Sequence, residues 1–132
     1  MVLTERQGQF IQEQRLCSLA TLRKDGSPQN TLVYYLYEDG KFFITSTKPR
    51  IKTINIQRDP RVALCVLQEG PPFNYVQVLG TAVVTEEELV ERTARIFLRF
   101  RPQLPENFPQ YLANEQRVLV VVTPERTTER FA

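Results

Sequence analysis

The sequence predicts a mainly β protein in which six antiparallel strands form one small barrel. Runs of β-branched and apolar residues recur along the chain, and turn signals separate most of them. Two of these turns are short and contain glycine, KDGS at 24–27 and DG at 39–40, as β-hairpin turns commonly do. Few segments have helical spacing. Side chains fill the interior of so small a barrel, so we expect a ligand to bind outside it, in a groove or between subunits.

The strands follow one another closely, and the first three are expected to form a meander. Their ranges are 16–23, 28–38, 41–47, 61–69, 75–85 and 117–126. Gly80, inside the fifth strand, indicates a bulge or the close approach of another backbone. The last strand contains an unbroken run of valine and leucine, which predicts burial on both of its faces.

Helices are expected before the first strand and after the third. Thr4 is a suitable cap for a short first helix, which would place Phe10 and Ile11 on its inner face. A second helix is expected over 49–58. It would end at Asp59–Pro60, because the residue before a proline disfavours the α conformation.

A third, clearly amphipathic helix is expected over 86–100. Thr85 is its expected cap, and three glutamates occupy its first turn, where the helix dipole favours negative charge. The segment 101–110 contains three prolines and is expected to be a loop.

Length and charge limit the classes of protein to consider. The chain has 132 residues, a usual length for one domain, so we expect a single domain over 1–132. Lysine plus arginine number 17 and aspartate plus glutamate 15, and a net charge of only +2 argues against coating nucleic acid through bulk charge. No apolar run approaches the ~20 residues of a membrane span, and the N-terminus lacks the pattern of a secretory signal. We therefore expect a cytoplasmic protein that binds neither nucleic acid nor membranes.

The sequence contains no histidine. This excludes Ser-His-Asp and Cys-His nucleophiles and most zinc sites, and we expect no metal site. Cys17 and Cys65 lie in strand-like runs without CxxC spacing. Two buried free thiols are therefore favoured over a disulfide.

The start of the second helix carries an unusual arrangement of charge. Lys48, Arg50 and Lys52 lie at the helix end where the dipole is positive and cations are disfavoured. A bound anion would reverse this penalty, since backbone N–H groups and basic side chains together form an anion site. Hydroxyl donors from Thr45–Thr47 precede it immediately. The alternative is an exposed helix end with solvated side chains, which is common for charge runs.

Around this helix the sequence resembles a known family. The pattern ATLRKDGSPQ, followed by RIKTINIQRDPRVAL and YVQVLGTA, is similar to the pyridoxamine 5'-phosphate oxidase-like split β-barrel flavoproteins, and more narrowly to the small flavin- and deazaflavin-dependent oxidoreductases. The similarity covers residues 19–84, with a weaker match at 117–126. It implies a split barrel and a homodimer with two cofactor sites between the subunits.

The resemblance also implies roles for individual residues. Arg50 and Lys52 would hold the cofactor phosphate. The remaining residues that it implies are Thr45, Ser46 and Thr47 in the same pocket, Gln29, Thr31 and Val33 on the strand beside the flavin ring, and Gln77 from the partner subunit. The catalytic residues stay unknown, since hydride transfer is the cofactor's own chemistry.

Two features bear on the ligand. The cofactor implied is FMN or the deazaflavin coenzyme F-420, and Lys48 and Arg58 are candidates to extend the groove toward the longer anionic tail of F-420. Alternation along the second strand puts Tyr35 and Tyr37 on one face and Tyr34 on the other. Packing in the core or in a dimer is the expected role of these tyrosines, and stacking on a planar ligand is the alternative.

We therefore expect an oxidoreductase that transfers hydride between the bound cofactor and a small unsaturated or planar substrate. The alternative is a protein of the same fold that binds or stores the cofactor or a tetrapyrrole without turnover. A third, less favoured hypothesis is a barrel that binds single-stranded nucleic acid through Arg50, Lys52 and exposed tyrosines.

Overall fold

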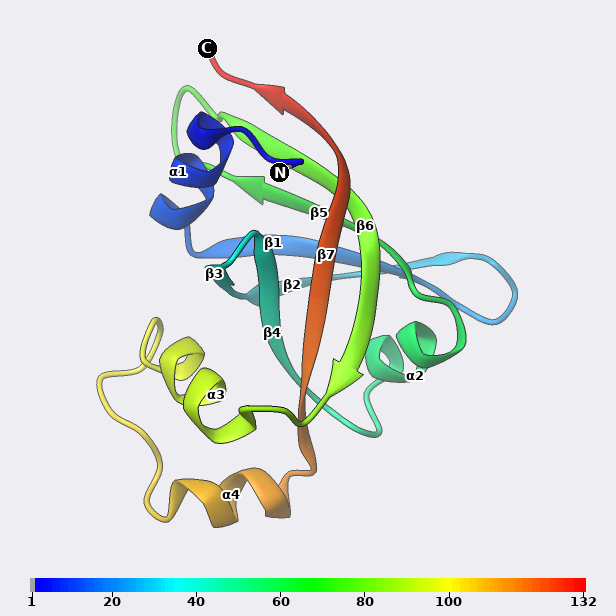
Figure 1. The fold of residues 1–132 in the computed structure, drawn as a ribbon, viewed down its shortest axis with the longest axis vertical. Coiled ribbons are helices and arrows are strands. Elements are labelled where there is room, and N and C mark those ends of the chain that lie inside the picture. Colours follow the sequence, from blue (N-terminus) through cyan, green and yellow to red (C-terminus); the bar gives the residue numbers. More distant parts are fainter. Residues whose placement is uncertain (1) are drawn as a thin grey trace.

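One curled antiparallel sheet dominates the computed structural model, which describes residues 2–132 (Figure 1). The strands are β1 (Leu16–Leu22), β2 (Pro28–Tyr34), β3 (Leu36–Glu38), β4 (Lys41–Thr47), β5 (Arg61–Leu67), β6 (Tyr75–Thr85) and β7 (Arg117–Arg130). The helices are α1 (Glu5–Glu13), α2 (Ile51–Arg58), α3 (Leu89–Phe97) and α4 (Phe108–Asn114). The strand order is β2-β1-β5-β6-β7-β4-β3. The mainly β, antiparallel split-barrel prediction is confirmed, with seven strands instead of six.

The additional strand arises because the predicted second strand is interrupted at Tyr35. On one side of Tyr35, β2 pairs with β1, and on the other side β3 pairs with β4, at the opposite edge of the sheet. Both predicted hairpins form, but the expected meander of three continuous strands is wrong, because its middle strand is divided between the two edges. The side chain of Tyr35 is fully buried and donates a hydrogen bond to the carbonyl of Ile11 (2.6 Å), while Arg99 donates to the carbonyl of Tyr35. A chain that joins both edges of one sheet curls it into a half-barrel.

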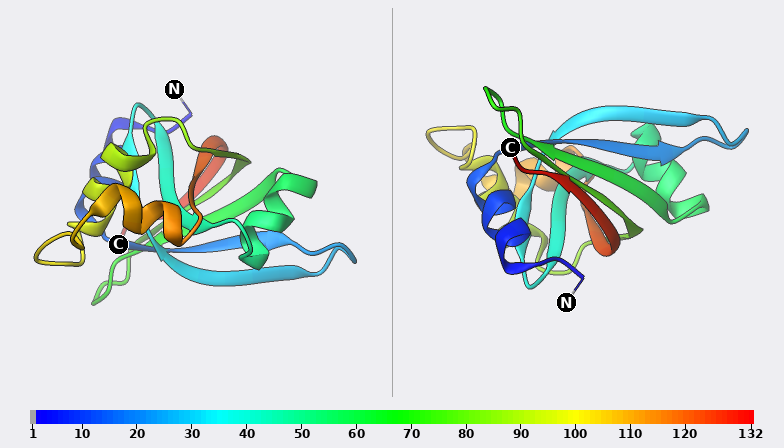
Figure 2. Two further views of the ribbon diagram at one scale, coloured as in Figure 1. Left: turned by 90° about the horizontal axis from the view of Figure 1, so that it is seen from below. Right: turned by 90° about the horizontal axis from the view of Figure 1, so that it is seen from above.

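Apolar side chains on the inner face of the half-barrel form the core, as expected for so small a barrel. The inner face of β4 contributes Phe42 and Ile44, and that of β7 contributes Val120 and Val122. The run Val118–Val120 is buried throughout, which confirms the predicted burial of both faces of the last strand there. Helices α1 and α2 pack at opposite ends of the half-barrel (Figure 2).

The first helix begins as predicted. The hydroxyl of Thr4 accepts a hydrogen bond from the backbone N–H of Gln7 (3.1 Å), and the side chain of Gln7 accepts one from the N–H of Thr4 (3.0 Å). This reciprocal pair is a capping box. Ile11 is fully buried, so the inner face of α1 is the one that the sequence indicates.

The region around α3 differs from the prediction in two respects. The helix starts at Leu89 instead of directly after Thr85, because Glu88 adopts a left-handed conformation (φ 53°) and the hydroxyl of Thr85 caps only a turn at Glu87. The predicted loop also contains α4, whose Phe108 and Leu112 pack against Phe97 of α3. Leu89–Phe97 covers the outer face of β4 and β7 near Phe43 and Leu119. Among residues 2–132, no helix is both long and apolar enough to cross a membrane.

Candidate functional site

The N-terminus of α2 is an uncapped helix start in a basic environment. Arg50 is the N-cap residue, and no side chain accepts a hydrogen bond from the first-turn N–H groups there. The predicted helix thus begins two residues later than expected, after a turn at Lys48 and Pro49. The first turn of α2 contains no acidic residue. Free N–H groups and a positive dipole end favour an anion at this position.

Lys52 is the most unusual residue of this site. Its side chain lies in the first turn of α2, and the residue retains only 8% of its exposure. No ion pair or hydrogen bond of its ammonium group is found among residues 2–132. Burial lowers the pKa of Lys52 below its ordinary value, and the nearby positive charges of Arg50 and Arg117 lower this pKa further. A largely buried lysine whose ammonium keeps some contact with solvent but has no counter-ion is unfavourable, so this position is suited to receive an anion.

The three hydroxyl residues before α2 differ in their availability. Ser46 faces the helix and shares a hydrogen bond with the hydroxyl of Thr53 (2.8 Å), which itself donates to the carbonyl of Thr47 (2.7 Å). The hydroxyl of Thr45 accepts a hydrogen bond from Arg117 (3.3 Å). No hydrogen bond involves the hydroxyl of Thr47 in the described part of the chain. Ser46 therefore fixes α2 to β4, and Thr47 keeps a free donor.

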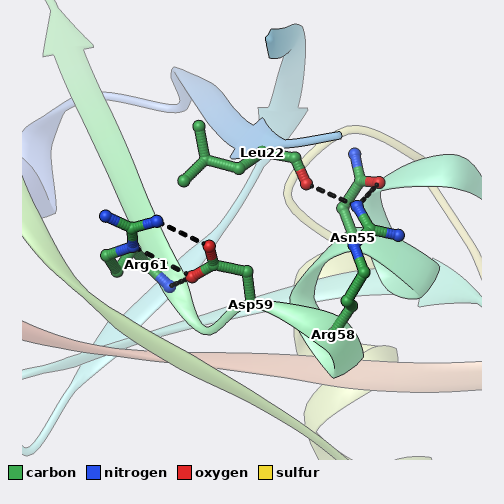
Figure 3. A network of polar contacts seen from close by, with 5 residues as sticks. All are labelled: Leu22, Asn55, Arg58, Asp59 and Arg61. Atoms are coloured by element: carbon green, nitrogen blue, oxygen red, sulfur yellow. Dashed lines mark hydrogen bonds and ion pairs between the residues drawn. The ribbon is translucent and has the colours of Figure 1, made fainter. Parts of the chain in front are cut away.

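Two cations named as extensions of the groove are engaged elsewhere. The ammonium group of Lys48 lies 3.9 Å from a carboxylate oxygen of Glu86. Arg58, at the other end of α2, donates to the carbonyl of Leu22 (2.8 Å) and to the side-chain oxygen of Asn55 (2.9 Å), as Figure 3 shows. The uncompensated positive charge of this region is therefore concentrated at the helix start.

The pair Asp59–Arg61 closes the C-terminal end of α2 (Figure 3). The guanidinium of Arg61 lies 2.8 Å from the carboxylate of Asp59. The hydrogen bonds from Arg61 lower the pKa of Asp59 to about 2. Arg61 is exposed and Asp59 is partly buried, and they stabilise the turn between α2 and β5 without facing the helix start.

The predicted residues of β2 point toward the inside of the half-barrel. The register of β2 with β1 places Gln29, Thr31 and Val33 on the same face as the buried side chain of Leu19. The amide oxygen of Gln29 accepts a hydrogen bond from Thr21 (3.2 Å).

A chain of hydrogen bonds connects this strand to α2. The hydroxyl of Thr21, which donates to Gln29, accepts in turn from the amide of Asn55 (3.0 Å). The hydroxyl of Thr31 is buried without a partner, which is uncommon for a buried polar atom in the described residues. Gln29 and Thr31 thus line the polar inner side of β2.

Gln77 lies on the opposite, outer face of the sheet. It accepts a hydrogen bond from the hydroxyl of Thr128 (2.8 Å) and lines a groove of about 450 Å³. The floor of this groove is Ser18, Ala20, Ala63 and Cys65, and Asn30, Leu79, Arg126 and Thr128 also contribute to it. Gln77 and the β2 residues therefore do not meet within one chain.

The cysteines and tyrosines have structural surroundings. Cys17 and Cys65 are free thiols, as predicted; Cys17 is buried in the core as expected, whereas Cys65 is only partly buried and faces the outer groove. Tyr35 and Tyr37 are buried together beside Phe42, and Tyr34 stacks on Phe100 with 4.2 Å between the ring centres. The predicted alternation of the tyrosines is confirmed, and packing accounts for all three.

Arg117 is the residue near the site that sequence reasoning missed. It is the first residue of β7 and pairs in register with Thr47 at the end of β4. Its guanidinium lies 2.8 Å from the carboxylate of Glu115. A separation of 70 residues from Thr47 hides this proximity from any local pattern, and only the pairing of β4 with β7 brings them together.

Comparisons with known proteins place this geometry in a family. The family model described as pyridoxamine 5'-phosphate oxidase matches residues 3–131, which is almost the whole chain. The chain therefore belongs to the pyridoxamine 5'-phosphate oxidase family, and the resemblance noted in the sequence is confirmed.

Solved structures agree with this assignment. A conserved hypothetical protein of Mycobacterium tuberculosis is 25% identical, with a TM-score of 0.81 over 98% of this chain and 85% of that one. A protein named F420 reductase is 23% identical, with a TM-score of 0.78 over 96% and 98% of the two chains. The heme storage protein HutZ of Vibrio cholerae is 18% identical, with a TM-score of 0.74 over 97% and 94%. The latter two likenesses are of fold alone.

Proposed function

We propose that this protein is an oxidoreductase that binds a flavin-type cofactor, FMN or coenzyme F-420, with the cofactor phosphate at the start of α2. The observation that carries the proposal is Lys52, a largely buried lysine whose ammonium reaches solvent without a counter-ion beside free helix N–H groups. Arg50 offers a guanidinium at the same helix start, and Thr47 offers a hydroxyl. The family membership and the F420 reductase among the similar structures support this class of cofactor.

The residues at the start of α2 fit the anionic end of a cofactor whose ring carries out the reaction. When bound, a flavin or deazaflavin supplies hydride transfer to or from a small unsaturated or planar substrate. The chain's own residues bind the anionic end, through Arg50 and Lys52, and fix it relative to the sheet. In the outer groove the titratable side chains are Cys65 and Arg126, and burial raises the pKa of the Cys65 thiol. A thiol whose pKa is raised is a poor proton donor, so the proton of a reduction would come from solvent.

The uncovered outer face of β2, β1, β5 and β6 supports a homodimer. Small side chains form its floor, Ala20 and Ala63 among them, and Leu32 and Leu79 stand exposed at 67% and 45%. Covering such apolar surface with a second copy is favourable. We propose that this face packs against the partner subunit, which would bring the partner's Gln77 to the cofactor site.

Ala63→Arg tests the dimer. A charged side chain in the middle of the small-residue floor would prevent close packing, so we expect the wild type to have the mass of two chains and Ala63→Arg that of one in size-exclusion chromatography with light scattering. Leu98→Arg is the control, since Leu98 is 51% exposed on the side of α3 and lies outside the groove. A wild-type monomer, or a dimeric Ala63→Arg variant, would contradict the proposed interface.

Cofactor binding is tested directly with the purified protein. We expect the absorption spectrum of a bound flavin or deazaflavin, or binding of FMN or F-420 at micromolar concentration after removal of the native ligand. Oxidation of the reduced cofactor in the presence of a panel of unsaturated acceptors then tests turnover. Failure to bind either cofactor would remove the proposal.

A second candidate is a cofactor- or tetrapyrrole-binding protein without turnover. It is favoured by the lack of a side chain suited to acid–base catalysis in the outer groove. The heme storage protein of similar fold shows that non-catalytic roles are worth testing. This hypothesis predicts tight cofactor binding, with no oxidation of the reduced cofactor when acceptors are added. Because the sequence contains no histidine, heme binding would need another axial ligand.

A further inference from the structure

We propose that Arg117 is the third cationic residue of the anion site and makes it selective for a dianionic phosphomonoester, such as the phosphate of FMN, over a monoanionic phosphodiester. This inference rests on the proposed function and names the chemical class of the anion that the same site takes. Neither the local sequence pattern nor the comparisons assign a role to Arg117.

The position of Arg117 is fixed by two strands. It pairs in register with Thr47, and the N–H of Lys48 donates to the carbonyl of the preceding residue, Gln116 (3.0 Å). The backbone of Arg117 is therefore fixed beside the turn that leads into α2, and its guanidinium is near enough to Lys52 to lower the pKa of that ammonium. Its side chain is 15% exposed, which limits the solvent screening of its charge.

The contacts of Arg117 hold the group in place and leave part of it free. Its Nε donates to Glu115 (2.8 Å), and its Nη1 donates to the hydroxyl of Thr45 (3.3 Å). The guanidinium carbon lies 5.4 Å from the ring centre of Phe97. No acceptor for Nη2 is found among residues 2–132, so this nitrogen can donate to a ligand. A planar group fixed on three sides loses little entropy when it binds an oxyanion.

The charges of the site determine which anion matches it. Arg50, Lys52 and Arg117 carry three positive charges, and Glu115 is the one carboxylate within ion-pair distance of any of them in the described residues. Two positive charges remain uncompensated. A phosphomonoester carries about −1.5 to −2 at neutral pH, whereas a phosphodiester carries a single negative charge. Arg101 adds a further positive charge near Glu115, with its guanidinium carbon 4.7 Å from the ring centre of Phe97, whereas Lys48 and Arg58 are engaged elsewhere.

Arg117→Gln is the variant that tests this role. Glutamine retains hydrogen-bonding capacity but removes the charge, and we expect FMN to bind about tenfold to a hundredfold more weakly, as for the loss of a charged hydrogen bond. Riboflavin, which lacks the phosphate, should bind equally to the wild type and the variant. We also expect the wild type to bind FMN more tightly than F-420.

Arg61→Gln is the matched control. Arg61 also binds a carboxylate two residues before it at 2.8 Å, but it lies at the other end of α2. The Arg61→Gln protein should bind FMN with the affinity of the wild type. Any of three results would overturn the inference. FMN affinity could fall equally in Arg117→Gln and Arg61→Gln, or Arg117→Gln could lose riboflavin affinity as much as FMN affinity. The third result is that the wild type binds F-420 more tightly than FMN.

Two further measurements keep the test decisive. Glu115→Gln removes the carboxylate that offsets the site, so FMN should bind this variant more tightly; unchanged or weaker binding contradicts the inference even where Arg117→Gln fails to fold. FMN affinity of the wild type should also rise between about pH 5.5 and about pH 7.5, as the phosphate loses its second proton near pH 6. Absence of that rise contradicts the preference for a dianion.

Failure of the proposed function can be distinguished from failure of the role of Arg117. If the wild type binds neither FMN nor F-420, the cofactor proposal fails, and thermal stabilisation by inorganic phosphate then tests the role of Arg117. Thermal stabilisation of the wild type by phosphate, absent in Arg117→Gln, would support the anion site alone. If phosphate stabilises neither protein, the inference fails as well. If the wild type binds FMN and Arg117→Gln binds it equally, only the role of Arg117 is lost.

Discussion

Lys52→Met is expected to bind FMN about a hundredfold more weakly than the wild type, while the cofactor-free protein becomes harder to unfold. The loss of affinity follows because removing one partner of a buried charged contact typically costs about 3 kcal/mol of binding free energy. The gain in stability follows because Lys52 is buried at 8% exposure without a counter-ion. Because the ammonium keeps some contact with solvent, replacing this lysine by an apolar residue of similar length should raise the free energy of unfolding by about 1 kcal/mol, the lower end for an unsatisfied buried group.

The pH dependence of unfolding provides an independent check. The pKa of Lys52 in the folded protein lies below its ordinary value of 10.5, because burial and the charges of Arg50 and Arg117 disfavour the ammonium form. The charged ammonium of Lys52 lowers the free energy of unfolding. This loss of stability is fully present below the pKa that Lys52 has in the folded protein, and it disappears as the pH rises from that value toward 10.5. The stability advantage of Lys52→Met should therefore shrink in alkaline solution. Urea unfolding of both cofactor-free proteins over the alkaline range measures this difference.

Lys48→Met is the control for Lys52→Met. Lys48 is also a lysine beside the helix start, but its side chain is 55% exposed and pairs with Glu86. An exposed ion pair contributes little, so we expect stability within about 0.5 kcal/mol of the wild type. A Lys52→Met protein that is less stable than the wild type, or that binds FMN with unchanged affinity, would show that Lys52 has a structural role and no ligand.

The anion site was predictable from the sequence only in its local part. Arg50, Lys52 and the residues Thr45–Thr47 lie within one short stretch, so their charge and hydroxyl groups point to an anion before any fold is known. What the sequence could not show is the burial of Lys52 beside two exposed isoleucines, Ile51 and Ile54. This inverted polarity of α2 arises because Thr53 and Asn55 on its inner face bond to the hydroxyl groups of Ser46 on β4 and Thr21 on β1.

The fold shows the same division between local and distant information. Short glycine turns, the Thr4 cap and the strand runs are local signals, and the structure confirms them. The sequence does not predict the interruption at Tyr35, because a continuous run of aromatic and β-branched residues does not indicate where a strand changes its partner. Helix α4 is not predicted because the three prolines of 101–110 are typical of a loop, although proline is also well suited to the first turn of a helix, where Pro109 lies.

Gly80→Ala is expected to destabilise the protein by about 3 kcal/mol, a large part of the stability of an ordinary domain. The register of β6 and β7 shifts between Leu79 and Gly80, which confirms the bulge that the sequence indicates. A Cβ atom at Gly80 would lie 2.3 Å from the carbonyl oxygen of Thr123 and 3.2 Å from the Cα of Pro124. Both neighbours are backbone atoms of β7, so relief requires the longest strand pair of the sheet to separate.

Gly70→Ala is the matched control for this effect. No atom lies within 4 Å of a Cβ built at Gly70, and its φ is not in the left-handed region. The same substitution there should leave stability unchanged or raise it by about 0.4–1 kcal/mol through the unfolded state. Urea unfolding of the two variants separates a packing effect from the general cost of replacing glycine. If Gly80→Ala and the wild type unfold at similar urea concentrations, the backbones of β6 and β7 do not approach each other at Gly80 as closely as we describe. Because the β6–β7 pair lies between β5 and β4, its loss would also disturb the outer groove and the start of α2.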